Sequence, residues 1–232
     1  ALSVYQQEIV LGGLRLIGPH AVIARLERRL AEASPKELRE AALAVYGELA
    51  DRGDMPRMFA LARPERDQAI DDDLDAALRS SLARLFVRDP LAVPRLAITW
   101  RSLAPDLLTS TILALGDAPD GRGLGLAIDA AFLHDELLPL VASQVAVIGR
   151  SPDVDVNAHA AEFLNDRLDR AEGYVASALV RALGALEDEI SIARWVQLLS
   201  DESGSLRSAA LWSLRRVSGL GYGEDPQPWR TW

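Results

Sequence analysis

The sequence predicts an all-α fold in which about six helical hairpins follow one leading helix. The main observation is a column of apolar residues, most of them followed by glycine, near the ends of predicted helices. Neighbouring members lie roughly 30 to 40 residues apart, which is the range of helical-repeat arrays. The column contains Ile17-Gly18, Tyr46-Gly47, Leu115-Gly116, Ile148-Gly149 and Leu183-Gly184, and continues without glycine at Leu85-Phe86 and Leu214-Arg215.

A second column of aspartates supports the repeat. Asp51, Asp120, Asp153 and Asp188 each follow the apolar member of their pair by five residues. An aspartate there can cap the next helix by accepting a hydrogen bond from its first turn. No run of alternating β-branched or aromatic residues bounded by Asn-Gly competes for a β-hairpin.

The helices of the first half follow from proline and aspartate signals. Pro19 stands at a helix start, and Ser34-Pro35 is typical of an N-cap and first helical residue. Pro105 opens a helix that ends at Gly116, and Ile9 to Ile17 reads as a leading second helix without a first. The helix that starts at Ser34-Pro35 is predicted to end at about Leu49. The other predicted helices run from Pro19 to Ala33, from Asp54 to before Pro64, from Glu65 to Val87, and from Asp89-Pro90 with a kink or delay at Pro94.

The second half shows the repeat most clearly between Tyr174 and Gly219, where two similar helices align Leu183 on Leu214. Small side chains in the second helices let neighbouring helices approach closely, and Gly184 is predicted to lie where its helix packs closely on a neighbour or bends. Each hairpin then buries its apolar face on the next one. The predicted helices are Gly121 to Leu133, Glu136 to Ile148, Val154 to Leu168, Ala171 to Leu186, Glu189 to Leu199 and Ser205 to Val217.

The last residues are predicted to cap the array, because a terminal repeat has no neighbour to cover it. We therefore divide the chain into a repeat array over residues 1–218 and a capping tail over residues 219–232. Tyr222, Trp229 and Trp232 supply the apolar cover, and Pro226 and Pro228 are expected to force an extended path.

Composition narrows the function. The chain has 232 residues, a net charge of −9 and no cysteine, which excludes disulfides and cysteine-ligated metals. The negative balance argues against nucleic acid, since such surfaces need clustered positive charge. No apolar run is long enough to span a membrane and no signal peptide is visible, so we expect a cytoplasmic protein. The chain begins without methionine, so one hypothesis is that it is a fragment whose binding partner is the rest of a longer protein.

The positive charge is almost all arginine, and Lys36 is the only lysine. We interpret this bias as a compositional habit of a GC-rich source genome.

The repeat pattern resembles the HEAT-repeat family of bacterial type. The best matches are Leu38 to Asp51, Tyr174 to Asp188 and Ser205 to Gly219, and the tail from Gly219 resembles the closing segment of such proteins. The resemblance covers most of the chain and is weakest from Asp54 to Ala104. It implies a right-handed α-solenoid whose second helices line a concave face and which binds other proteins.

Three chemical interpretations within that family find no support in the residues. His20, His134 and His159 share no metal spacing, so iron binding is rejected and His134 is predicted to cap a turn. Trp100 and Trp195 have no carboxylate one helical turn away, which argues against a DNA glycosylase. No residue carries over from bilin lyases. We therefore expect no cofactor, no metal and no catalytic residue.

Two further clusters have plain interpretations. Asp71, Asp72, Asp73 and Asp75 either meet a basic partner or a cation, or form a solvated helix start suited to the helix dipole; we favour the helix start. The glycines from Gly121 to Gly125 follow a helix rather than a strand, so they do not form a dinucleotide site.

The candidate protein-binding residues occupy matching positions of the second helices. These positions are Ala44, Arg84, Leu113, Ala146, Arg181 and Trp212, with Arg215 and Arg216 one turn beyond Trp212. Arginine and tryptophan are the residue types that anchor interfaces. The alternative is that the arginines are solvated or paired with acids and that Trp212 packs under the tail.

The sequence thus favours a non-enzymatic scaffold or adaptor that binds a protein or peptide, acidic and partly apolar, through Arg84, Arg181, Trp212, Arg215 and Arg216. The alternative hypothesis is a HEAT-like enzyme, or an enzyme-associated protein, that acts on nucleic acid or a cofactor.

Overall fold

The computed structural model describes residues 19–32, 35–63 and 70–232. All regular secondary structure in these residues is helical, with no strand among them, which confirms the all-α prediction. The predicted leading helix Ile9 to Ile17 and the Ile17-Gly18 pair lie outside the described residues. Contacts between Cα atoms divide the chain into two compact units, Ala1–Ala118 and Pro119–Trp232, called unit 1 and unit 2 below.

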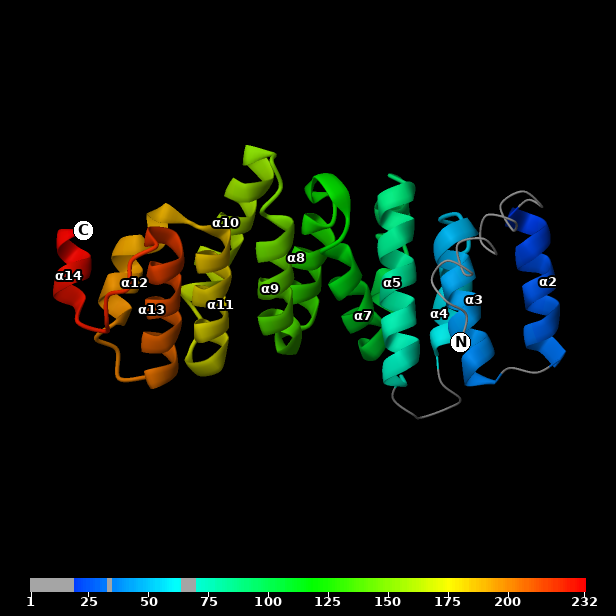
Figure 1. The fold of residues 1–232 in the computed structure, drawn as a ribbon, viewed down its shortest axis with the longest axis horizontal. Helices are drawn as coiled ribbons and strands as arrows, with labels where there is room; N and C mark the ends of the chain where they lie inside the picture. Colours follow the sequence, from blue (N-terminus) through cyan, green and yellow to red (C-terminus); the bar gives the residue numbers. More distant parts are fainter. Residues whose placement is uncertain (1–18, 33–34, 64–69) are drawn as a thin grey trace. The chain divides into compact units, whose positions relative to one another are not determined.

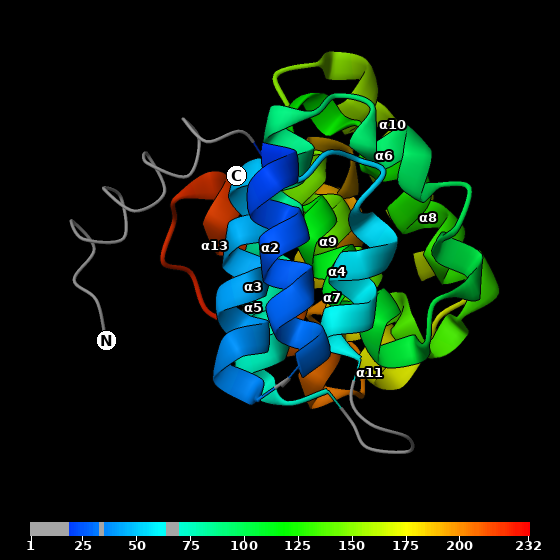
Figure 2. The same cartoon turned by 90° about the vertical axis from the view of Figure 1, so that its right-hand side faces the viewer.

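Unit 1 contains the helices α2 (Pro19–Glu32), α3 (Lys36–Leu49), α4 (Met55–Ala62), α5 (Asp72–Arg88), α6 (Ala92–Leu96) and α7 (Pro105–Leu115), and the short 3-10 helix η1 (Trp100–Ser102). The helices α3, α5 and α7 pack on one another in chain order. Figure 1 shows α3 and α5 side by side, and Figure 2 shows α2 and α4 beside α3. The core between these helices holds fully buried Leu43, Tyr46, Leu82 and Phe86.

Unit 2 contains α8 (Leu124–Leu133), α9 (Leu138–Ile148), α10 (Val154–Leu168), α11 (Gly173–Leu186), α12 (Ile192–Leu198), α13 (Gly204–Ser218) and α14 (Pro226–Thr231), with 3-10 turns η2 (Pro119–Gly121), η3 (Asp135–Leu137) and η4 (Glu189–Ser191). The helices α9, α11 and α13 pack successively, as Figure 1 shows. Each also packs on the helix that precedes it in the chain: α8, α10 and α12, respectively.

Two glycines of the apolar–glycine column lie very close to a serine on a neighbouring helix. A Cβ atom on Gly47 would lie 2.9 Å from Cα of Ser81 on α5, and one on Gly184 would lie 2.8 Å from Cα of Ser213 on α13. The two serines make equivalent bonds. Ser81 Oγ donates to the carbonyl of Leu43 at 2.7 Å, and Ser213 Oγ donates to that of Val180 at 3.0 Å. The same contact therefore occurs once in each unit, one helical turn before the glycine, and confirms the close packing predicted at Gly184.

Arginines donate hydrogen bonds to carbonyls at the C-terminal ends of neighbouring helices in both units. Arg88 donates to the carbonyl of Gly47 at 2.6 Å and to that of Ala50. Arg39 donates to the carbonyls of Leu61 at 2.7 Å and Arg63 at 2.6 Å. In unit 2, Arg150 donates to Ala185 at 2.9 Å and Arg167 to Ala131 at 3.0 Å. These groups satisfy carbonyls that a helix end leaves without an internal partner.

The capping prediction for the aspartate column is right at one position and wrong at three. Asp153 caps α10 by accepting from the amide of Asp155. Asp51 instead accepts from Gly53 within a turn at 2.6 Å, because the next helix starts later, at Met55. Asp120 has a left-handed backbone with φ of 60° and pairs with Arg122, and Asp188 accepts from the Ser191 hydroxyl.

Further boundary predictions need correction. Among the described residues, the helix predicted from Glu65 to Val87 begins only at Asp72, after its N-cap Asp71. The N-cap of α3 is Pro35, whose ψ of 154° is extended, so that the helix begins at Lys36 rather than at the proline. The tail is not extended: Pro226 stands at the first position of α14, where its fixed φ suits a helix start. The capping role of the tail fits the burial of Trp229, which is 2% exposed, on a helix that contacts α12.

Candidate protein-binding surface

Four of the five predicted binding residues lie on two adjacent helices of unit 2. Arg181 is on α11, and Trp212, Arg215 and Arg216 are on α13, which packs against α11. Arg181 is exposed, and its side chain makes no hydrogen bond or ion pair with any described residue. Trp212 is 39% exposed, which is high for so large an apolar side chain. This exposed fraction does not favour the alternative interpretation, in which Trp212 packs under the tail.

Arg216 joins this exposed tryptophan to the end of α11. Its guanidinium carbon lies 5.6 Å from the centre of the Trp212 ring, in the range of a cation–π contact. Its Nη2 atom lies 3.5 Å from a carboxylate oxygen of Glu187. Both contacts are solvent-exposed, so they orient the side chain more than they stabilise the fold.

Arg215 is used within the molecule. Its Nε and Nη2 atoms donate to the carbonyl of Tyr222 at 3.0 and 2.8 Å, which attaches the tail to α13. The structure thus gives Arg215 a role in positioning the tail. This agrees better with the alternative interpretation, in which the arginines are bonded within the molecule, than with a binding role.

Arg84, the fifth predicted binding residue, lies in unit 1. It is exposed on α5, and its Nη1 atom lies 2.6 Å from a carboxylate oxygen of Glu48 on α3. The remaining matching positions differ in exposure: Ala44 is exposed, Leu113 is half-buried and Ala146 is buried. The matching positions therefore do not present one uniformly exposed row.

A pocket of about 330 Å³ lies beside Arg216 and was not predicted from the sequence. It is lined by Arg150, Ser151, Asn157, Ala185, Leu186, Glu187 and Arg216. Asn157 is fixed by donating to the carbonyl of Gly149 at 3.0 Å. A signal for part of this pocket was present, because Arg150 directly follows the Ile148-Gly149 pair. The contribution of Asn157, from the first turns of α10, has no counterpart in the repeat columns.

A larger pocket of about 400 Å³ in unit 2 has balanced charge. Its lining includes Asp135, Arg167, Arg170 and Glu172. Arg167 pairs with Asp135 at 2.6 Å, and Arg170 pairs with Asp166 at 3.0 Å. Its two arginine–carboxylate pairs are shorter than the 3.5 Å contact of Arg216 with Glu187, so this pocket offers less to a charged ligand than the pocket beside Arg216.

The acidic residues 71–75 form the predicted helix start. Asp71 caps α5 by accepting from the amide of Asp73. The ammonium group of Lys36 lies 2.5 Å from Asp71 and 2.6 Å from Asp73. Glu40, Asp71 and Asp73 are close enough to hold a metal ion, but this ammonium group already bonds both aspartates. The hydrogen bond from Lys36 lowers the pKa of Asp71, and the two aspartates raise the pKa of Lys36.

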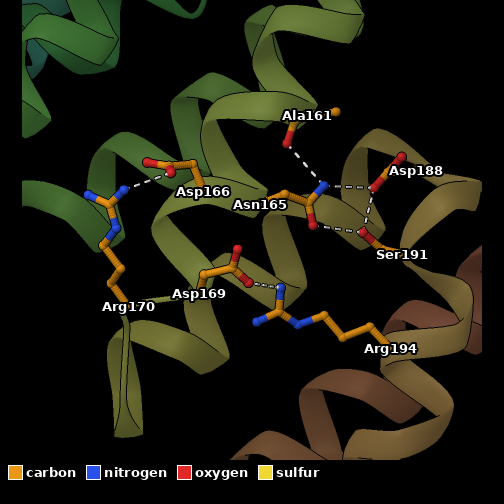
Figure 3. A network of polar contacts seen from close by, with 8 residues as sticks. All are labelled: Ala161, Asn165, Asp166, Asp169, Arg170, Asp188, Ser191 and Arg194. Carbon is orange, nitrogen blue, oxygen red and sulfur yellow. Dashed lines mark hydrogen bonds and ion pairs between the residues drawn. The ribbon is translucent and has the colours of Figure 1, made fainter.

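A polar network in unit 2 connects α10 to the turn before α12 (Figure 3). Asn165 donates to the carbonyl of Ala161 and to the carboxylate of Asp188 at 3.1 and 3.2 Å. The hydroxyl of Ser191 lies 2.5 Å from Asp188 and 3.1 Å from the Asn165 oxygen. Beside it, Arg194 bonds Asp169 at 2.7 Å. The network gives hydrogen-bond partners to the partly buried side chains of Asn165, Asp188 and Ser191.

The remaining candidates are packing or surface residues. Trp100 and Trp195 are 3% and 0% exposed, so neither can stack on an external base. His134 does not cap a helix through its side chain; its Nδ1 atom lies 3.2 Å from Glu136. His159 is on α10, 3.9 Å from Glu162, and the side chain of His20 lies outside the described residues.

Neither a protein-family model nor a curated protein sequence matches this chain. Among the described residues, no helix combines the length and apolar character needed to cross a membrane.

Proposed function

We propose that this protein is a HEAT-like α-solenoid that acts as a non-enzymatic scaffold or adaptor. In this proposal it binds an acidic, partly apolar segment of another protein on the surface formed by Arg181, Trp212 and Arg216. The observation that carries the proposal is the exposed Trp212 ring, held against Arg216, on a helix that packs against the helix of the exposed Arg181.

The chemistry of these three side chains favours a protein partner. Trp212 offers a large apolar face that gains free energy when it is covered, and it loses little conformational freedom on binding. Arginine presents a planar fork of donors that matches a carboxylate. The net charge of −9 keeps nucleic acid and other polyanions away from most of the surface, so a short acidic segment must find a local basic site.

The test compares capture of binding proteins from the native source by the parent and by Trp212→Ala, followed by titration of the recovered segment. Trp212→Ala should weaken binding by about 2 kcal/mol, or roughly thirtyfold, if Trp212 is a hot spot. Arg181→Glu should slow association, because an exposed charge acts mainly on the encounter rate.

Trp232→Ala is the matched control, because Trp232 is also exposed, at 51%, but lies in the tail. Unchanged affinity in both Trp212→Ala and Arg181→Glu would place the interface on another part of the molecule.

A further inference from the structure

Glu187 adopts a backbone conformation that usually belongs to glycine. It ends α11 with φ of 60° and ψ of 38°, in the left-handed region. Helices commonly end in this way with glycine, which has no Cβ to strain. The C-cap of α13 follows that rule with Gly219 at φ of 72°. The presence of glutamate at the end of α11 therefore needs a reason in its side chain.

That side chain faces a basic pocket. The pocket of about 330 Å³ is lined by two arginines, Arg150 and Arg216, and by one acid, Glu187. Arg150 uses its Nε atom on the carbonyl of Ala185, and neither of its Nη atoms is bonded within the described residues. Since arginine carries five donors, several remain available at the pocket. The local charge is positive in a chain whose net charge is −9.

The contact between Glu187 and Arg216 is loose. It spans 3.5 Å and is exposed, with 63% of the Glu187 side chain accessible. A well-formed bond between guanidinium and carboxylate is shorter, about 2.7–2.9 Å. An external carboxylate can therefore replace Glu187 on Arg216 at little cost and can reach Arg150 at the same time.

We propose that this pocket receives a glutamate or aspartate side chain of the bound segment, and that Glu187 is an internal competitor for it. The inference rests on the proposed function, because Arg216 also supports the Trp212 ring. Because Arg216 lines the pocket and also contacts the Trp212 ring, an acidic side chain in the pocket would bring a neighbouring apolar residue of the segment close to Trp212. The two sites together select a segment in which a carboxylate is next to an apolar residue.

The pocket is tested with fluorescein-labelled tetraglutamate, with tetraglutamine as the uncharged probe, by fluorescence anisotropy at low salt. Glu187→Gln should tighten tetraglutamate binding about three- to fivefold, since exposed ion pairs of this kind are weak. Arg150→Ala should weaken it by a similar factor, and tetraglutamine should not bind.

Glu189→Gln is the matched control. Glu189 follows Glu187 by two residues, carries the same charge and is exposed, but it does not line the pocket. Equal tightening by Glu187→Gln and Glu189→Gln would overturn the proposal, since net charge alone would then explain the effect. Stronger competition by inorganic phosphate than by unlabelled tetraglutamate would also overturn it, by assigning the pocket to a phosphate group.

The two proposals can fail separately. If Trp212→Ala weakens binding of the natural segment but Glu187→Gln leaves tetraglutamate binding unchanged, the surface is correct and the pocket is wrong. If tetraglutamate binding changes as expected but Trp212→Ala leaves the affinity for the natural partner unchanged, the pocket is correct and the proposed interface is wrong.

Discussion

A Cβ atom on Gly184 of α11 would lie 2.2 Å from the hydroxyl oxygen of Ser213 on α13 and 2.8 Å from its Cα atom. Real Cβ contacts essentially never fall below 3.0 Å, so glycine is required for these two helices to pack as they do. Gly184→Leu should therefore destabilise the protein by roughly 1–3 kcal/mol through overpacking. Urea denaturation of the purified variant measures this loss.

Gly125→Ala is the control for the glycine substitution, because a Cβ there meets nothing within 4 Å. It lies in α8 and should be neutral or slightly stabilising, since alanine favours a helix. Ser213→Gly should rescue Gly184→Ala only partly, because the Cα atom at residue 213 remains in the way. Full stability of Gly184→Leu on its own would show that the contact is absent in solution.

The buried Trp229 side chain is expected to supply most of the free energy that holds the tail on the array. It is 2% exposed, its indole nitrogen donates to the carbonyl of Gly223 at 2.8 Å, and the Tyr222 ring meets it edge-on. Trp229→Ala should cost about 3 kcal/mol, the range for truncating a buried aromatic residue. Deleting residues after Gly219 should expose the same apolar surface and cause aggregation in size-exclusion chromatography.

Trp232→Ala, at an exposed position, should change the free energy of unfolding by far less than Trp229→Ala. A truncated protein that remained monomeric and as stable as the parent would remove the capping role of the tail.

The Lys36 contacts predict a defined dependence of stability on pH. The pKa of Asp71 is lowered from its ordinary 3.8, so its stabilising contribution is present above 3.8 and is lost as the pH falls through the lowered value. The pKa of Lys36 is raised from 10.5, so its contribution is present below 10.5 and is lost at higher pH still. Lys36→Met should therefore lower the melting temperature at neutral pH, and the difference from the parent should close in acid.

Lys36→Arg keeps the charge and should stay nearer to the parent across the range. A difference between parent and Lys36→Met that is the same at pH 7 and well below 3.8 would show that the charge contacts contribute nothing.

Local signals predicted the helices well where the physical cause is local. The helix Val154–Leu168 was predicted to the residue, because Asp153 caps it and leucine closes its apolar face. The helix Pro105–Leu115 was predicted from the proline at its first position. The tail was predicted wrongly because two prolines suggested an extended chain, although Pro226 and Pro228 both fall in the first turn of a helix, where no amide donor is needed.

The candidate surface was harder to predict because exposure depends on neighbouring helices. The repeat columns placed Arg181 and Trp212 correctly on adjacent helices, but the same columns placed Ala146 at a buried position. The use of Arg215 on the Tyr222 carbonyl depends on how the tail folds back, which no periodicity encodes. The pocket beside Arg216 combines residues from four segments, and the left-handed backbone of Glu187 leaves no mark in the sequence.

The arginine bonds between helix ends fix orientation as well as distance. A guanidinium group that donates to two carbonyls, as Arg88 does with Gly47 and Ala50, forms a two-point attachment. Two points define a direction, so the attachment resists rotation of α5 about its own axis relative to α3, which a lysine ammonium acting as a point charge would allow. The guanidinium also stays protonated at every pH at which a protein remains folded. At this helix end arginine therefore supplies an orientation that lysine would not.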